Sequence, residues 1–206
     1  MQDYHHDRAR ALLANATQIV TPEEVQAAVK RVAVQLNTRF NAEKSFPLVL
    51  GVMGGAVVFT GNLLPQLDFP LEFDYIHVSR YGDADRGGQI VWKVIPRQDV
   101  TGRIIVVVDD ILDEGETLAH VKQRLLDMGA AEVIIAVFAD KDLKRAKPIK
   151  ADLIGLTLPN EFVVGFGMDV YNYWRNLPGL WSISQADLSA AEPEPEFPVP
   201  DAKKLD

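Results

Sequence analysis

Ile105-Val106-Val107-Val108-Asp109-Asp110-Ile111-Leu112-Asp113-Glu114-Gly115-Glu116-Thr117 is the stretch that decides the fold class of this chain. Its four leading apolar residues, most of them β-branched, predict a buried β-strand. Two adjacent carboxylates follow where this strand is expected to end, and then come a third carboxylate, a glycine turn and a threonine that starts a helix. In open α/β sheets, ligands lie beyond the carboxyl ends of the strands, and a helix N-terminus offers unpaired N–H groups to a phosphate. The stretch therefore predicts a phosphosugar site.

The segments before this stretch predict alternating helices and strands. Thr21 as a cap, Pro22 at the first helical position and Glu24 three residues after the cap form a strong helix start, and apolar spacing extends that helix to about Phe40. Four further segments are predicted to be regular: a strand at 48–53, a helix at 56–67 and strands at 71–79 and 90–95. The last two strands are joined by a polar, glycine-rich loop over 79–89, and a loop of this length inside a domain is typical of a lid.

The segments around and after the quoted stretch predict a βαβ unit followed by a small lobe. The unit consists of a strand at 103–109, a helix at 117–128 and a strand at 132–138, with Gly129 as the helix stop. After Ala139 the helical spacing ends, and short strands are predicted in a separate lobe at 152–156, 162–165 and 180–183. Alternating strands and helices predict an α/β fold in which a parallel twisted sheet is flanked by helices.

Composition narrows the classes of function. The 206 residues fit one domain, and a hydrophobic fraction of 48% is enough for a full core. The net charge of −8 disfavours a broad nucleic-acid footprint, and no apolar run is long enough to span a membrane. The chain has no cysteine, which excludes disulfides and a cysteine nucleophile. We expect a cytoplasmic protein that needs local cations, helix N-termini or a bound metal for an anionic substrate.

Asp109 and Asp110 have a functional and a structural interpretation. Carboxylates at a strand end suit the hydroxyls of a ribose and a Mg²⁺ ion that also holds phosphate oxygens. Alternatively, the pair caps the next helix or forms the acidic pocket of a receiver domain. The N–H groups of 114–117 could bind a phosphate, although an ordinary helix start, where acidic residues are favoured, accounts better for the side chains of Glu114 and Glu116.

Taken together, several blocks in order make this chain resemble the purine phosphoribosyltransferases, specifically those that act on hypoxanthine and guanine. The match is carried by the acidic stretch quoted above and extends from about residue 46 to residue 183. The other matching blocks are Ser79-Arg80-Tyr81-Gly82, Asp140-Lys141, the segment 158–169 and Tyr173-Trp174-Arg175-Asn176-Leu177-Pro178. The resemblance implies a type I phosphoribosyltransferase fold with a small hood lobe.

The resemblance also implies roles for single residues. It implies that Asp113 is the general base toward purine N7, that Lys141 donates to the 6-oxygen, and that Phe162 stacks on the ring. Metal contacts to Mg²⁺ are implied for Asp109, Asp110 and Asp169. The substrate-binding residues that it implies are Met53, Gly54, Gly55, Arg80, Tyr81, Asp109, Asp110, Glu114, Gly115, Glu116, Thr117, Lys141, Phe162, Val163 and Arg175.

Three of these positions depart from the family pattern. Many members have neutral or basic residues where this chain has Glu114 and Glu116, and a charged side chain where it has Met53. Because backbone groups make most of the phosphate contacts, the departures bear on phosphate affinity and leave the reaction unchanged.

The resemblance predicts one phosphoribosyltransferase domain over 1–188, with a core at about 40–140 and a hood formed by the N-terminal segment and about 150–185. We expect an acidic, proline-rich, disordered tail at 189–206. The implied function is purine salvage: transfer of the 5-phosphoribosyl group from phosphoribosyl pyrophosphate to hypoxanthine or guanine. The implied assembly is a homodimer or homotetramer. The alternatives are a xanthine-preferring enzyme and a non-catalytic, nucleotide-sensing regulator of the same fold that binds RNA.

Overall fold

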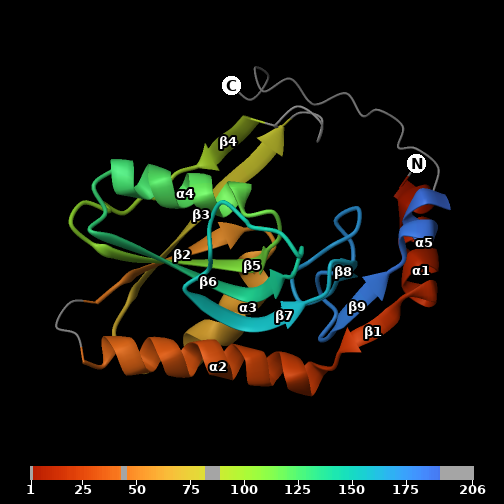
Figure 1. Ribbon diagram of the computed structural model, residues 1–206, viewed down its shortest axis with the longest axis horizontal. Helices are drawn as coiled ribbons and strands as arrows, with labels where there is room; N and C mark the ends of the chain where they lie inside the picture. Colours follow the sequence, from red (N-terminus) through yellow and green to blue (C-terminus); the bar gives the residue numbers. More distant parts are fainter. Residues whose placement is uncertain (1, 43–45, 82–88, 191–206) are drawn as a thin grey trace.

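The computed structural model describes residues 2–42, 46–81 and 89–190 (Figure 1). The strands are β1 (Thr17–Val20), β2 (Leu48–Met53), β3 (Glu72–Tyr81), β4 (Gln89–Val94), β5 (Ile104–Leu112), β6 (Glu132–Lys141), β7 (Leu153–Leu158), β8 (Phe162–Val164) and β9 (Leu180–Ile183). The helices are α1 (Gln2–Asn15), α2 (Pro22–Phe40), α3 (Ala56–Leu63), the 3-10 turn η1 (Leu64–Gln66), α4 (Glu116–Asp127) and α5 (Gln185–Ala190). The strands form a six-stranded sheet in the order β4-β3-β2-β5-β6-β7 and a three-stranded sheet in the order β1-β9-β8.

The six-stranded sheet is parallel except for β4 and is covered on both faces, as predicted. Helices α2 and α3 lie on one face and α4 lies on the other (Figure 1). Successive residues of β5 alternate between two apolar clusters: Val106 and Val108 pack on the side of α2 and α3, and Ile105 and Val107 on the side of α4. Burial on both faces explains why this strand is an unbroken apolar run.

The helix boundaries follow local signals. At the start of α2, the Thr21 hydroxyl accepts a bond from the Glu24 N–H and the Glu24 carboxylate accepts one from the Thr21 N–H, which is the predicted capping box. At the end of α4, Gly129 has φ +95°, and the N–H groups of Gly129 and Ala130 reach back into the last turn. The helix predicted at 56–67 is shorter: it ends at Leu63 and continues as η1, which contains the proline.

The second sheet and α1 form a hood. β1 pairs with β9, so the N-terminal segment completes a sheet whose other strands come from the end of the chain. Leu12 of α1 packs in one cluster with Val164, Val170 and Ile183. Figure 1 shows α1, β1, β9 and α5 together at one end of the molecule, beside the six-stranded sheet. The amphipathic signal of α1 is weak, and the sequence did not lead us to predict this helix.

One strand prediction is wrong in its placement. We expected the strand at 152–156 in the separate lobe, but β7 is the edge strand of the six-stranded sheet and runs parallel to β6. A parallel neighbour needs only a crossover of about a dozen residues, and here an irregular segment supplies it in place of a helix. The absence of helical spacing after Ala139 was therefore a misleading sign of a lobe boundary.

Two predictions fall mainly outside the described residues: the lid loop over 79–89 and the tail over 189–206. Residues 79–81 belong to the end of β3, residue 89 begins β4, and residues 189 and 190 belong to α5, but residues 82–88 and 191–206 are not described. Of the helices in the described ranges, none combines the length and apolarity that crossing a bilayer would require.

Candidate active site

The acidic pair lies within β5 and not after it. The strand continues to Leu112, because its parallel pairing with β6 extends to Leu112 opposite Asp140. The strand predicted at 103–109 is therefore longer than expected, and the two carboxylates do not both follow its end. Since side chains alternate along a strand, Asp109 lines a cavity on the α4 side and Asp110 lines another beside the hood.

The turn at 113–117 has the backbone of an anion site. Gly115 caps α4 in the left-handed conformation, with φ +88°, and contributes no side chain to the cap. In contrast to α2, no side-chain cap bonds the first N–H groups of α4, which leaves them available to a ligand. A cavity of about 230 Å³ lies over this turn. Its lining consists of Asp109, Ile111, Leu112, Asp113, Glu114, Gly115, Glu116, Thr117 and Leu118.

Burial perturbs both members of the acidic pair. Burial and then the neighbouring charge of Asp110 raise the pKa of Asp109 well above its ordinary value. Burial also raises the pKa of Asp110, an effect reduced by its bonds to Asp109 and the Ile111 N–H and by the charge of Arg175. Because burial disfavours negative charge at both carboxyl groups, a bound cation would favour their ionised forms. The pair therefore suits a cation or sugar hydroxyls.

The glycine loop after β2 meets Asp110 directly. A Cβ atom on Gly55 would lie 1.8 Å from the Asp110 Oδ2 atom, so only glycine allows this close approach. A Cβ atom on Gly167 would lie 2.2 Å from the Gly55 carbonyl oxygen, and Arg175 donates to the Gly167 carbonyl at 2.6 Å. The Met53–Gly54 peptide bond at the start of this loop is cis. The structure thus brings the glycine loop, the acidic pair and Arg175 together.

Lys141 and Asp113, from the ends of two neighbouring strands, form an ion pair of 2.7 Å. They line a cavity of about 190 Å³ together with Asp110, Ile111, Phe162, Val163, Met168 and Asp169. Phe162 is 39% exposed, whereas Val163 is buried and pairs with Ser182 in the hood sheet. This cavity therefore combines a cation, a carboxylate and an accessible aromatic ring.

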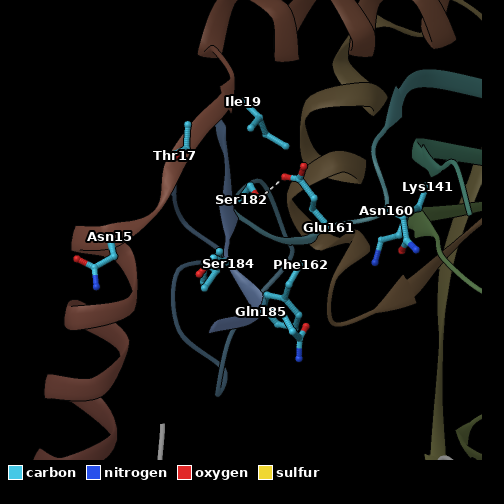
Figure 2. Close-up of a pocket in the computed structure, with 11 residues that line it drawn as sticks. Asn15, Thr17, Ile19, Lys141, Asn160, Glu161, Phe162, Ser182, Ser184 and Gln185 are labelled. Carbon is cyan, nitrogen blue, oxygen red and sulfur yellow. Dashed lines mark hydrogen bonds between the residues drawn. The ribbon is translucent and has the colours of Figure 1, made fainter. Parts of the chain in front are cut away.

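A larger cavity of about 790 Å³ lies under the hood and shares Lys141 and Phe162 with the smaller one. Figure 2 shows Lys141 and Asn160 on its side nearer the six-stranded sheet and Asn15 and Thr17 on the side of α1 and β1. The Ser182 hydroxyl donates to the Glu161 carboxylate within it. The hood thus extends the space around the aromatic ring.

The predicted metal ligands do not gather at one point. Asp110 and Asp169 line the same cavity, but Asp109 lines the other, and Asp169 is paired with Arg175 at 2.6 Å. In the described ranges, no three His, Cys, Asp or Glu side chains are grouped so that they could hold an ion by themselves. The carboxylates still fit Mg²⁺, because that ion is usually held by one or two carboxylates together with substrate oxygens and water.

Sequence reasoning missed Lys147. Its ammonium group contacts the Leu112 carbonyl oxygen at 2.7 Å and the Asp140 carboxylate at 2.5 Å, behind the turn. In the sequence it is one of several lysines in a polar run, with no signal that distinguishes it from a solvated residue. The side chains of Arg80 and Tyr81, predicted to bind substrate, lie outside the described part of the structure.

Comparisons of the sequence and of the structure with known proteins all identify phosphoribosyltransferases as similar. The profile of the phosphoribosyl transferase domain family matches residues 15–170. The hypoxanthine-guanine phosphoribosyltransferase of Bacillus subtilis is 36% identical over 171 residues, which cover 82% of this chain and 93% of that protein. The hypoxanthine-guanine-xanthine phosphoribosyltransferase of Tritrichomonas foetus is 33% identical, covering 80% and 89%. A solved hypoxanthine phosphoribosyltransferase from Trypanosoma cruzi superposes with a TM-score of 0.77 at 27% identity, covering 84% of this chain and 97% of that one.

Proposed function

Because the chain belongs to the phosphoribosyl transferase family, we propose that it transfers the 5-phosphoribosyl group from phosphoribosyl pyrophosphate to hypoxanthine or guanine. The products would be the nucleotide and pyrophosphate, and the role would be purine salvage. The similarity to relatives named for this reaction over most of their length supports the proposal. The cytoplasmic location and the homodimeric or homotetrameric assembly stay predictions.

The observation that carries the proposal is the Lys141–Asp113 pair beside Phe162. The 6-oxygen and N7 of a 6-oxopurine lie next to each other on one edge of the ring. A lysine ammonium can only donate, so it suits the 6-oxygen and disfavours the amino group of adenine at that position. A carboxylate at hydrogen-bond distance from that ammonium would then face N7, and the aromatic ring would stack on the base.

Each of these residues would have a separate role in the reaction. Asp113 accepts the proton that the purine loses as its N9 attacks the anomeric carbon, while the bond from that carbon to pyrophosphate breaks. The sugar passes through a cationic state and the leaving group gains negative charge, which Arg175, beside Asp110 and Asp169, would offset. Bound Mg²⁺, held by one or two of the carboxylates of Asp109, Asp110 and Asp169 together with substrate oxygens, would neutralise the diphosphate. The N–H groups of 114–117 would hold the 5′-phosphate.

A kinetic panel tests this function. Purified full-length protein with Mg²⁺ and phosphoribosyl pyrophosphate is assayed with hypoxanthine, guanine and xanthine, and we expect the nucleotide and pyrophosphate to form with the first two. The variant Asp113→Asn should lower kcat by about 100-fold or more, as expected for loss of a general base, with the KM for the base little changed. Absence of turnover with every 6-oxopurine would reject the function, and equal losses in kcat and base binding would make Asp113 a structural residue.

A further inference from the structure

The proposed phosphate turn has an electrostatic problem. The cavity over it is lined by four carboxylates, those of Asp109, Asp113, Glu114 and Glu116, and by no lysine or arginine among its described lining residues. Arg145 pairs with Glu114 at 2.7 Å, but both side chains are more than half exposed, and exposed pairs of this kind contribute little. A phosphate bound here needs a positive charge from elsewhere, placed so that solvent does not screen it.

Lys147 is such a charge. Its side chain is 10% exposed, and its ammonium group lies between the Leu112 carbonyl oxygen and the Asp140 carboxylate. These two partners face each other in register across β5 and β6. The ammonium therefore bridges the neighbouring strands β5 and β6 at the point where β5 ends and the turn begins.

The contact with Leu112 reaches the turn through one peptide group. The carbonyl that accepts the bond from Lys147 belongs to the peptide unit whose nitrogen is that of Asp113, the first residue of the turn. In a trans peptide the N–H points opposite to the C=O, so fixing the carbonyl also fixes the direction of the Asp113 N–H. A cation on the carbonyl side also polarises the peptide and strengthens its N–H as a donor.

The residues next to Lys147 support the turn sterically. A Cβ atom on Gly115 would meet Ile149 and Pro148 at 3.3 Å and the Cβ of Lys147 at 3.4 Å. The segment 147–149 is thus packed against the back of the turn where the backbone adopts its left-handed conformation. The same segment that brings the cation also defines the shape of the turn.

We propose that Lys147 is a positioning residue for phosphate binding: its buried ammonium fixes the Leu112–Asp113 peptide and polarises the N–H of that peptide from behind the acidic turn. The proposal rests on the proposed function, since it concerns the 5′-phosphate of the same substrate. A stronger N–H donor in the turn would also partly compensate for Glu114 and Glu116, whose negative charges by themselves would weaken the affinity of this turn for a phosphate.

The test compares Lys147→Met with Arg145→Met in the full-length protein. Both variants lose one cation from the same connection, but only the first loses the buried one. We expect Lys147→Met to raise the KM for phosphoribosyl pyrophosphate and the calorimetric Kd for IMP by roughly tenfold or more, the size of a lost bond to a charged group. The KM for hypoxanthine should stay within about twofold, and Arg145→Met should leave all three constants within about twofold.

A double variant distinguishes a role of Lys147 in positioning the turn from a role in neutralising the Asp140 carboxylate. Lys147→Met leaves the partly buried Asp140 carboxylate without its partner, which alone destabilises the protein. Combining it with Asp140→Asn removes that charge, so we expect the thermal midpoint to recover while the KM for phosphoribosyl pyrophosphate stays raised. If Lys147→Met fails to fold, the double variant provides the same comparison.

The outcomes distinguish this inference from the proposed function. A wild-type protein that forms no nucleotide would reject the function itself. An active wild type whose Lys147→Met variant keeps the KM for phosphoribosyl pyrophosphate and the Kd for IMP within twofold would overturn only the inference. So would a double variant with wild-type constants, because Lys147 would then serve merely to neutralise Asp140.

Discussion

The burial of Asp109 lowers the stability of the folded protein at neutral pH, and its proposed role in binding ribose and metal requires a carboxylate at this position. Burial and the adjacent charge raise its pKa, so at intermediate pH the folded protein binds a proton that the unfolded chain releases. This contribution to stability is fully present below the ordinary carboxyl pKa of 3.8 and is lost as pH rises through the raised value. At neutral pH and above, the ligand-free protein should therefore be destabilised by this group.

The variant Asp109→Asn keeps the shape of the side chain and cannot ionise. We expect its thermal midpoint, without substrate or Mg²⁺, to exceed that of the wild type at about pH 8, and the difference to shrink as the pH is lowered toward about 5. Turnover should fall at the same time, because the carboxylate proposed to hold ribose and metal is gone. A variant that is less stable than the wild type at every pH would show that the raised pKa does not govern stability here.

At the scale of elements, the predictions that rested on local sequence signals are confirmed, whereas features that depend on pairing between distant strands were not predicted. The capping box at Thr21 and Glu24 and the stop at Gly129 are local, and the helices begin and end there. The end of β5 was misjudged because its last residues, including two aspartates, are kept in the strand by pairing with β6. The composition of a strand end does not indicate how far a neighbouring strand will pair with it.

The β3–β4 pair contains a buried carboxylate that sequence reasoning did not select. Asp74 is 1% exposed and accepts bonds from the N–H groups of Tyr75 and Arg97 and from the Arg97 guanidinium. Burial alone would raise the pKa of Asp74, but these bonds and the charge of Arg97 outweigh it and lower the pKa. The stabilisation is present above the ordinary carboxyl pKa and is lost as pH falls through the lowered value.

We expect Asp74→Ala to lower the free energy of unfolding by about 2–4 kcal/mol, because two backbone donors lose a buried charged acceptor. Glu72→Ala is a matched control on the same strand, since Glu72 is 57% exposed and pairs with Arg103. Its cost should be no more than about 1 kcal/mol. Urea denaturation of the three proteins measures both values, and equal effects would contradict the assignment of a structural role to the buried carboxylate.

At the scale of the whole molecule, the candidate site is divided between two sheets. The turn at 113–117 and Lys141 belong to the six-stranded sheet, whereas Phe162 and Val163 belong to the hood. The blocks of the resemblance led us to place these residues in one site, and four of them line one cavity: Asp113, Lys141, Phe162 and Val163. How the hood closes with α1 and β1 depends on contacts between the two ends of the chain, which no short motif encodes.

One such contact gives a test of the hood. The Trp174 indole N–H donates to the carbonyl oxygen of Ala9 in α1 at 2.7 Å, and Ala9 is fully buried. Trp174→Phe removes this bond and keeps an aromatic ring, which should cost roughly 1 kcal/mol. Trp92→Phe is the matched control in the large sheet, because the buried Trp92 N–H has no hydrogen-bond partner among the described residues.

We expect Trp174→Phe to speed amide exchange in β1 and β9 by roughly fivefold, the factor that corresponds to about 1 kcal/mol, while β5 and β6 exchange as in the wild type. Because the ring proposed to stack on the purine is carried by the hood, the KM for hypoxanthine should rise more than the KM for phosphoribosyl pyrophosphate. Trp92→Phe should leave both the hood exchange rates and the two KM values unchanged. If exchange in β5 and β6 rises as much as in the hood, the two sheets open as one unit, and the contact between α1 and Trp174 stabilises the whole fold.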